Sequence, residues 1–120
     1  MFNELSKNKK AEWAYDSKDN EWTSLDTWVK EDRDRKFVVR GFFINPHGKI
    51  TKTETGDVPY VVTDGFNIRL PLWYVKMVNM ILENDEYITG INKGQCGAKV
   101  MQYEDNFGKA RNKIELYDIE

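Results

Sequence analysis

The chain has 120 residues, a formal net charge of −2, 40% hydrophobic residues and 32% charged residues, and its mass is 14.2 kDa. A chain of this size is long enough for one domain with a hydrophobic core and too short for two. The mild acidity argues against a basic protein that wraps duplex DNA, but it is compatible with a local basic face, because net charge does not describe how charge is distributed.

The sequence shows no sign of export or of membrane insertion. No run approaches the roughly 20 apolar residues of a membrane-spanning helix, and the N-terminal MFNELSKNKK lacks the apolar stretch of a signal peptide. The single cysteine, Cys96, excludes an internal disulfide and is typical of a reducing compartment. We therefore expect a cytoplasmic protein that makes no contact with a membrane.

The N-terminal third is predicted to be an extension of the main domain. Residues 1–10 are polar, and we expect them to be flexible. Over residues 11–36, the extension proper, aromatic side chains first flank the turn-like stretch DSKDN, which predicts a short hairpin. Ser24 then caps a helical turn. The extension ends in a run of mixed charge, VKEDRDRK, which is typical of a loop or of a solvated face.

The middle of the chain is predicted to form three strands. Residues 37–44 are β-branched and aromatic, and the turn NPHG bounds them. Gly41 in the middle of this strand indicates a bulge or a sharp coil. Residues 50–55 are a weak edge strand or a loop. Residues 59–70 read as one or two short strands around the turn TDG.

A helix and a hairpin complete the predicted elements. Pro71 suits the first turn of a helix over residues 71–83, in which apolar residues recur at helical spacing. A second short helix follows, with Asn84 as its N-cap, and Gly94 ends it. Residues 97–103 and 109–118 then form two strands of a hairpin.

This order of elements predicts an all-β fold with one helix. Three strands, a helix and two strands is the order of a five-stranded OB-type barrel, whose first strand often coils to serve both halves of the barrel. We therefore expect a single OB-fold domain over residues 1–120, with the helix between strands 3 and 4 and an extra N-terminal hairpin. A ferredoxin-like fold would need a helix after the first strand. An unrelated small α+β sheet is the alternative.

The C-terminal hairpin carries the main candidate site. Side chains alternate along a strand, so a register that pairs odd with odd positions buries Ala98, Val100, Ile114 and Leu116 on one face. A loop of five residues (104–108), or of three with Gly108 in the left-handed region, gives this register. A loop of four would break up the apolar face, so the first register is expected. The other face then gathers Lys99, Met101, Tyr103, Lys109, Arg111, Lys113 and Tyr117.

A face of this kind has two interpretations. Proteins that bind single-stranded nucleic acid combine cations that follow the phosphates with aromatic rings that stack bases, at about 1–3 kcal/mol for each base. The alternative is that this is the solvent-exposed face of an ordinary hairpin and has no binding role. Lysine is common there because, on an edge strand, it suppresses aggregation between sheets. Arg40 and Phe42 in the first long strand either extend the same surface or, in the case of Phe42, belong to the core.

Other clusters are weaker candidates. Trp13, Tyr15, Trp22 and Trp28 are stacking platforms or a lid over one end of the barrel, and burial of at least two tryptophans is expected. Arg33, Arg35 and Lys36 lie next to Asp32 and Asp34, which largely cancel their charge. On the predicted helix, Trp73, Met77 and Met80 leave apolar surface that suits a subunit interface.

Catalytic and metal-binding patterns are absent from the sequence. His47 is the one histidine and Cys96 the one cysteine, so neither has companions for a metal site or a nucleophilic triad. The carboxylates lack the spacing of a two-metal nuclease, and there is no glycine-rich phosphate loop. We expect no enzymatic activity, no metal and no cofactor.

Several stretches together resemble a known group of proteins. They are FVVRGFFIN, GDVPYVVTD, NIRLPLWYVKMV, INKGQCGAKVMQYEDNFGK and the closing ELYDI. In order and spacing, over residues 37–119, they resemble the small single-stranded-DNA-binding proteins of lactococcal phages, which infect Gram-positive bacteria. The N-terminal third has no part in this resemblance.

The resemblance implies an OB fold, binding of single-stranded DNA in phage DNA replication or recombination, and a place in the host-cell cytoplasm. It also implies self-association as a homodimer or higher homo-oligomer, and contact with a host recombinase. Bacterial proteins of similar function carry an acidic tail that recruits partners. This chain ends at LYDIE, so recruitment by such a tail is not expected.

The prediction from the sequence is therefore a protein that binds single-stranded DNA with little sequence preference. Its expected contacts are Arg40, Lys99, Lys109, Arg111 and Lys113 to phosphates, and Tyr103 and Tyr117 to bases. The alternative is a non-enzymatic protein–protein interaction module of a phage that acts on a host protein through the tryptophan-rich N-terminal region or the methionine-bearing helix.

Overall fold

The computed structural model describes residues 12–29 and 35–119. The predicted flexible segment 1–10 and the part of the charged run that holds Asp32, Arg33 and Asp34 lie outside the described residues. The strands are β1 (Glu21–Ser24), β2 (Lys36–Val38), β3 (Gly41–Lys49), β4 (Thr55–Thr63), β5 (Phe66–Arg69), β6 (Cys96–Glu104) and β7 (Ala110–Asp118). The helices are α2 (Leu25–Trp28), the 3-10 turn η1 (Leu72–Tyr74), α3 (Val75–Leu82) and α4 (Asp85–Asn92).

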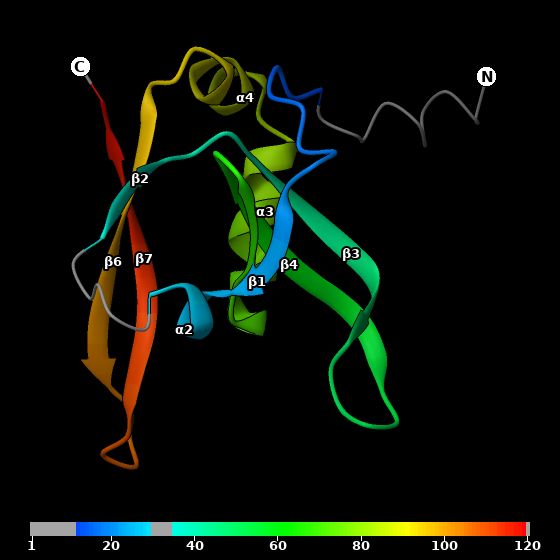
Figure 1. The fold of residues 1–120 in the computed structure, drawn as a ribbon, viewed down its shortest axis with the longest axis vertical. Coiled ribbons are helices and arrows are strands. Elements are labelled where there is room, and N and C mark those ends of the chain that lie inside the picture. Colours follow the sequence, from blue (N-terminus) through cyan, green and yellow to red (C-terminus); the bar gives the residue numbers. More distant parts are fainter. Residues whose placement is uncertain (1–11, 30–34, 120) are drawn as a thin grey trace.

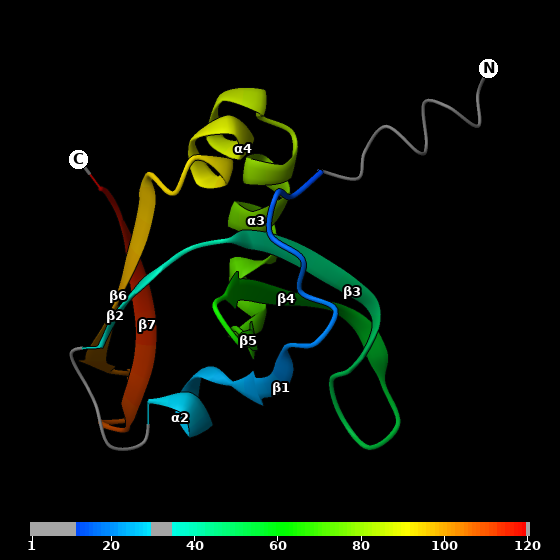
Figure 2. The ribbon, with the colours of Figure 1, turned by 45° about the horizontal axis from the view of Figure 1, so that its top comes forward.

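The strands form two sheets (Figure 1). Sheet A has the order β1-β5-β4-β3, and sheet B has the order β2-β6-β7. β1 runs parallel to β5, and the other paired strands are antiparallel. α3 packs against β3 and β4 of sheet A, and α4 lies at the end of the molecule opposite the β3–β4 and β6–β7 loops (Figure 2).

One stretch of extended chain, residues 36–49, serves both sheets. The backbone N–H of Val39 donates to the carbonyl of Cys96 in sheet B, and the next residue, Arg40, donates to the carbonyl of Val62 in sheet A. The chain bends there, just before Gly41. A Cβ at Gly41 would lie 3.0 Å from the indole of Trp13. The predicted sharp coil of the first strand therefore lies where the glycine indicated it.

The prediction of a five-stranded barrel with one helix is wrong. Closure of such a barrel would need β5 to pair with β7, and the described residues contain no such pair. The free edge of β5 is taken by β1, which the barrel prediction did not include. The fold is mostly β, as predicted, but it consists of two sheets with several short helices.

The predicted N-terminal hairpin is also wrong in the described residues. The turn DSKDN forms, with the N–H of Asn20 donating to the carbonyl of Ser17 at 3.1 Å. The segment before the turn does not pair with β1, however, because Trp13 lies across sheet A and donates its indole N–H to the carbonyl of Phe42 at 3.0 Å. Trp13 and Trp28 are half-buried against the core, whereas Trp22 and Trp73 are exposed.

The stretch NPHG is a bulge inside a strand and not the predicted turn. β3 continues through it to Lys49, and the register against β4 shifts between Asn45 and Gly48. A bulge accepts Pro46, which has no N–H for the ladder. The loop falls at residues 50–54 instead, where the N–H of Ile50 donates to the carbonyl of Glu54. The turn at TDG does form, with Gly65 at a φ of 84°.

The helix ends follow the sequence closely. Ser24 accepts a hydrogen bond from the N–H of Thr27 and caps α2, as predicted. Asn84 caps α4 by accepting from the N–H groups of Glu86 and Tyr87. Gly94 follows α4 with a φ of 73°, the left-handed conformation that commonly ends a helix. The predicted single helix over 71–83 is divided into η1 and α3.

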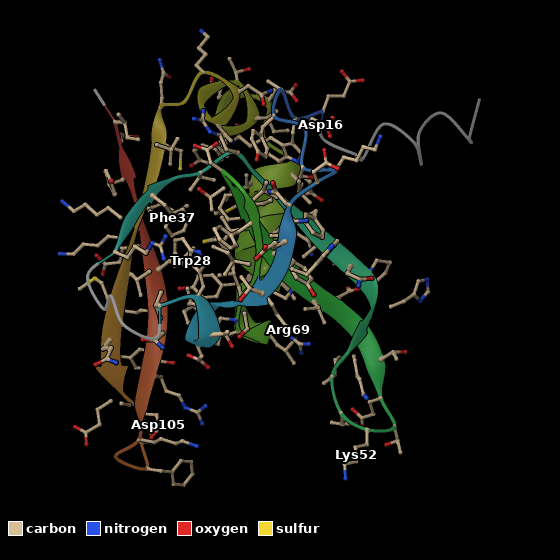
Figure 3. The ribbon with its side chains drawn as sticks, viewed as in Figure 1. Asp16, Trp28, Phe37, Lys52, Arg69 and Asp105 are labelled. Carbon is tan, nitrogen blue, oxygen red and sulfur yellow. The ribbon has the colours of Figure 1, made fainter. Side chains whose placement is uncertain are left out.

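The core lies between the two sheets and α3. Its fully buried side chains include Val39, Phe42, Val61, Ile68, Val78, Ala98 and Val100, so Phe42 belongs to the core. Trp28 packs edge-on against Phe37 at 5.0 Å between the ring centres, and both lie on the inner side of sheet B (Figure 3). Among the described residues, no helix has the length and apolar character needed to cross a membrane.

Candidate nucleic-acid interface

The register of the β6–β7 hairpin determines which side chains share a face. Val100 lies opposite Ile114, and Tyr103 lies opposite Arg111. The predicted pairing of odd with odd positions is therefore confirmed. The loop is residues 105–109, one residue later than predicted, so Lys109 lies in the turn and not opposite Tyr103. Ala98, Val100 and Ile114 are buried, whereas Leu116 is more than a third exposed.

The outer side of sheet B is a face rich in cations, and β2 contributes to it. Lys36 lies directly opposite Lys99 on β6. Directly opposite residues in an antiparallel pair share a face. We name this surface the cationic face; its side chains are Lys36, Val38, Lys99, Met101, Tyr103, Arg111, Lys113, Glu115 and Tyr117. Glu115 is the one acidic residue of this set.

Two of the four cations on this face have carboxylate partners. Arg111 pairs with Asp105 at 3.0 Å, and Lys113 pairs with Glu115 at 3.9 Å. Lys36 and Lys99 have no ion pair among the described residues. Like charges directly opposite on neighbouring strands destabilise a sheet. Lys36 and Lys99 are thus neighbouring positive charges without an ion pair in the described part of the chain, and Glu115 lies opposite Lys99 on β7.

The two tyrosines lie on the same face and contact its cations. The ring of Tyr117 packs on the backbone of Gly97, where a Cβ would collide with it. Lys36 Nζ lies 5.9 Å from the centre of that ring. Lys113 Nζ lies 5.7 Å from the ring of Tyr103. Cation–π contact of this kind is favourable, and it keeps rings and ammonium groups side by side.

Asp105 organises the turn at the end of the hairpin. One carboxylate oxygen accepts from the N–H groups of Phe107 and Lys109, both at 2.9 Å, and the other accepts from Arg111. The N–H of Lys109, and then Arg111, hold the pKa of Asp105 below its ordinary value. The result is an ordered turn that presents Phe107, whose side chain is 94% exposed.

Arg40 does not join the cationic face. It follows the bend between the sheets, and its guanidinium forms two hydrogen bonds with the carboxylate of Asp64, at 3.0 and 3.4 Å. Asp64 lies in the turn between β4 and β5, so this ion pair belongs to the end of sheet A. The predicted role of Arg40 as a phosphate contact on the hairpin surface therefore lacks support from its position.

Sequence reasoning missed Lys36 and Phe107. Lys36 stands in a run of mixed charge, and the nearby Asp32 and Asp34 indicated that its positive charge was largely cancelled. The alternation of Lys36, Phe37 and Val38 did carry a signal, because an inward Phe37 turns both neighbours outward. Phe107 could have been recognised as an aromatic residue inside a polar hairpin turn, where burial is not available.

A groove opens beside the hairpin, between β7 and the helices. Its volume is about 640 Å³, and its lining includes Met77, Met80, Tyr87, Cys96 and Leu116. Burial, followed by the nearby charge of Asp118, raises the pKa of the Cys96 thiol to about 11. The thiol is therefore protonated at neutral pH.

Residues 12–29 and 35–119 contain no group of three or more His, Cys, Asp or Glu side chains that lie close enough to hold a metal ion. No family model matches the chain, and no curated protein and no solved structure is similar enough to count as a match. The cationic face brings four cations together with the rings of Tyr103 and Tyr117.

Proposed function

We propose that this protein binds single-stranded DNA with little sequence preference, and that the cationic face is its binding surface. The observation that carries the proposal is the position of Lys36 directly opposite Lys99, with Tyr103 and Tyr117 on the same face. In this proposal Lys36, Lys99, Lys113 and Arg111 contact phosphates, and the two tyrosines stack bases. Lys109 and Phe107 extend the contact at the hairpin turn.

The electrostatics of the face favour an anionic ligand. The repulsion between Lys36 and Lys99 is a cost of folding, and the carboxylate of the face that lies opposite Lys99, Glu115, forms its ion pair with Lys113. A phosphate bound between the two ammonium groups would remove this cost and release counterions. Every base has a π face, so stacking on Tyr103 and Tyr117 tolerates any sequence. The chemistry therefore suits a single strand better than a specific duplex site.

The biological role that we propose follows from the resemblance of residues 37–119 to phage single-stranded-DNA-binding proteins. The protein would act in phage DNA replication or recombination in the host cytoplasm, without enzymatic activity of its own. Few cations lie on the face of each protomer, so we expect modest affinity for one copy. Self-association would raise it by placing several faces on one strand.

Fluorescence anisotropy of a labelled oligo-dT strand tests the proposal. The full chain is titrated at low and at moderate salt, beside a duplex of the same length. We expect tighter binding to the single strand and weaker binding as salt rises. The triple variant Lys36→Gln, Lys99→Gln, Lys113→Gln should lose most of the affinity, about tenfold or more, because three phosphate contacts disappear.

A second triple variant provides the matched control. Lys18→Gln, Lys76→Gln and Lys93→Gln remove the same charge from exposed lysines that lie outside the cationic face. This variant should keep affinity within about threefold of the original, since only long-range attraction is reduced. Equal losses in the two variants would mean that net charge and not the cationic face determines binding, and would contradict the proposed site.

The alternative from the sequence, a protein-interaction module that acts on a host protein, is favoured by a different feature. The groove beside β7 exposes Met80, Tyr87 and Leu116, and this much apolar surface in one place is typical of an interaction site. If oligo-dT fails to bind at low salt, the single-stranded DNA proposal is rejected and the interaction module becomes the better explanation.

A further inference from the structure

Three aromatic side chains lie together on the outer side of sheet A, far from the β6–β7 hairpin in the sheet topology. Phe43 on β3 and Tyr60 on β4 stack with ring centres 4.9 Å apart and planes at 6°. Trp22 on β1 meets both rings edge-on, at 5.7 Å from Phe43 and 5.2 Å from Tyr60. The indole is thus held in a fixed position by two partners.

Trp22 is nonetheless 63% exposed. Burial is the usual outcome for tryptophan, because it has more apolar area to remove from water than any other side chain. The neighbouring part of the same side of sheet A is covered, since Trp13 packs over Gly41, and Asn20 bonds to Asn67 at 3.2 Å. Trp22 lies beyond the part of the sheet that Trp13 and Asn20 cover, so its ring is available to a ligand.

The charge next to this ring is positive. In register, Gly41, Val62, Asn67 and Trp22 form one row across sheet A, and Phe43, Tyr60, Arg69 and Ser24 form the next. Arg69 is the one charged residue in these two rows. It has no ion-pair partner among the described residues, and it projects from the end of β5 beneath β1 (Figure 3).

An exposed indole held rigidly, with an unpaired guanidinium on the adjacent strand, is complementary to one nucleotide. The ring offers a π face for a base, and the guanidinium offers donors for the neighbouring phosphate. A peptide ligand would not need Arg69 unless it were acidic, and the surface has no second cation in these rows to hold an acidic peptide. The local chemistry therefore favours a nucleotide unit of a single strand.

We propose that Trp22, supported by Tyr60 and Phe43 and flanked by Arg69, is a second contact surface for single-stranded nucleic acid, separate from the cationic face. Trp22 stacks on a base, and Arg69 binds the adjacent phosphate. This inference rests on the proposed function, which it extends to sheet A. Trp22 belongs to the N-terminal extension, so the surface depends on a part of the chain outside the stretch that resembles phage proteins.

The test separates base contacts from phosphate contacts. The full chain is titrated against a fluorescein-labelled oligo-dT strand and against a strand of the same length in which every nucleotide is abasic. Trp22→Ala should weaken binding to oligo-dT about tenfold, because one stacked base is lost. The same variant should bind the abasic strand as the original chain does. Arg69→Gln should weaken binding to both strands, since it removes a phosphate contact.

Two further variants control for folding and for exposed aromatics in general. Trp22→Phe keeps a ring on the same scaffold and should recover most of the affinity for oligo-dT. Trp73 is 57% exposed on η1, away from this cluster, and Trp73→Ala should leave the affinity unchanged. The inference is overturned if Trp22→Ala binds oligo-dT as tightly as the original chain, or if Trp22→Ala and Trp73→Ala weaken it equally.

The outcomes also distinguish this inference from the proposed function. If the lysine triple variant loses binding and Trp22→Ala does not, the cationic face stands and the second surface is rejected. If Trp22→Ala loses binding and the lysine variant does not, the binding site lies on sheet A and the cationic face is rejected. If the original chain binds neither strand at low salt, both are rejected.

Discussion

The hydroxyl group of Tyr74 forms two hydrogen bonds with the backbone of one residue, Ile114. It accepts from the N–H of Ile114 at 2.9 Å and donates to the carbonyl of Ile114 at 3.0 Å. Ile114 lies in the middle of β7, on the edge that does not pair with β6. The side chain from η1 thus satisfies the backbone groups that a neighbouring strand would otherwise pair with, and it does so inside the core.

We expect Tyr74→Phe to destabilise the protein by about 2 kcal/mol, because both buried backbone groups of Ile114 lose their partner. Burial raises the pKa of Tyr74 and outweighs the opposite effect of the Ile114 hydrogen bond. The hydroxyl therefore keeps its proton at neutral pH and can donate it. Urea unfolding followed by circular dichroism measures the change in the free energy of unfolding.

Tyr87→Phe is the matched control for this prediction. Tyr87 lies on α4 and is exposed, and its hydroxyl has no hydrogen bond within the described part of the chain. Its substitution should change stability by less than about 0.5 kcal/mol. A Tyr74→Phe variant as stable as Tyr87→Phe would show that the two hydrogen bonds to Ile114 contribute little.

The predicted barrel stays open, with β1 on the free edge of β5 and Tyr74 bonded to Ile114 on the free edge of β7. The local alternation of apolar and polar residues was enough to predict the β6–β7 register, because Val100 and Ile114 must share the buried face. It was also enough for the caps at Ser24 and Asn84, which act within one helical turn. Barrel closure depends on what occupies the two strand edges of β5 and β7. Those edges are taken by β1 and Tyr74, which are distant in sequence and carry no strand-pairing signal.

The same distinction applies to the candidate site. The alternation within one hairpin predicted that Lys99, Tyr103 and Lys113 share a face, and the structure places them so. It could not predict that Lys36 lies opposite Lys99, because that pairing joins strands about sixty residues apart in the chain. The pairing of Arg40 with Asp64 was not predicted for a related reason. Its strand bends at that residue, so alternation along the strand no longer describes one continuous face.

Asp105→Asn should strengthen binding to single-stranded DNA. The amide oxygen can still accept from the N–H groups of Phe107 and Lys109, so the turn keeps its shape, but the charge that neutralises Arg111 is gone. One more cation is then free for phosphate. We expect a gain of about threefold in affinity at low salt, and a plot of log affinity against log salt that is steeper by about 0.7.

Asp64→Asn supplies the comparison, because it frees Arg40 from an ion pair of the same length outside the cationic face. Affinity and salt dependence should stay as in the original chain. If Asp64→Asn raises the affinity as much as Asp105→Asn does, Arg40 has to be included in the binding surface after all.

Gly97→Ala should weaken DNA binding by displacing Tyr117. The added methyl group would occupy the space of the Tyr117 ring, which is 39% exposed and can turn away into solvent. We expect the affinity for oligo-dT to fall about threefold to tenfold, as stacking on this ring is lost. In a chain that already carries Tyr117→Ala, Gly97→Ala should have no further effect, and this double-mutant cycle isolates the coupling.

Gly90→Ala shows what the same substitution does where space is available. A Cβ at Gly90, inside α4, would meet only the side chain of Gln95 at 3.8 Å. Alanine should therefore raise the free energy of unfolding by about 0.5–1 kcal/mol through its better helix propensity, and leave DNA binding unchanged. A loss of DNA affinity in Gly90→Ala would point to α4 as part of the binding surface.

Cys96 should react slowly with iodoacetamide until the pH is high. Its pKa is raised from an ordinary value of 9.0 to about 11, so at pH 8 the folded protein holds about 100-fold less thiolate than the unfolded chain. The logarithm of the alkylation rate should rise by about one for each pH unit up to about pH 11. Mass spectrometry of the alkylated chain, with and without urea, measures these rates.

The raised pKa of Cys96 also has a consequence for stability. The folded state binds the thiol proton more tightly than the unfolded state does, so this contribution to stability is fully present below about pH 9 and is lost as the pH rises through about 11. Asp118→Asn removes the smaller, electrostatic cause of the shift and should speed alkylation modestly. A rate that levels off near pH 9 in the folded protein would contradict the burial that raises the pKa of this thiol.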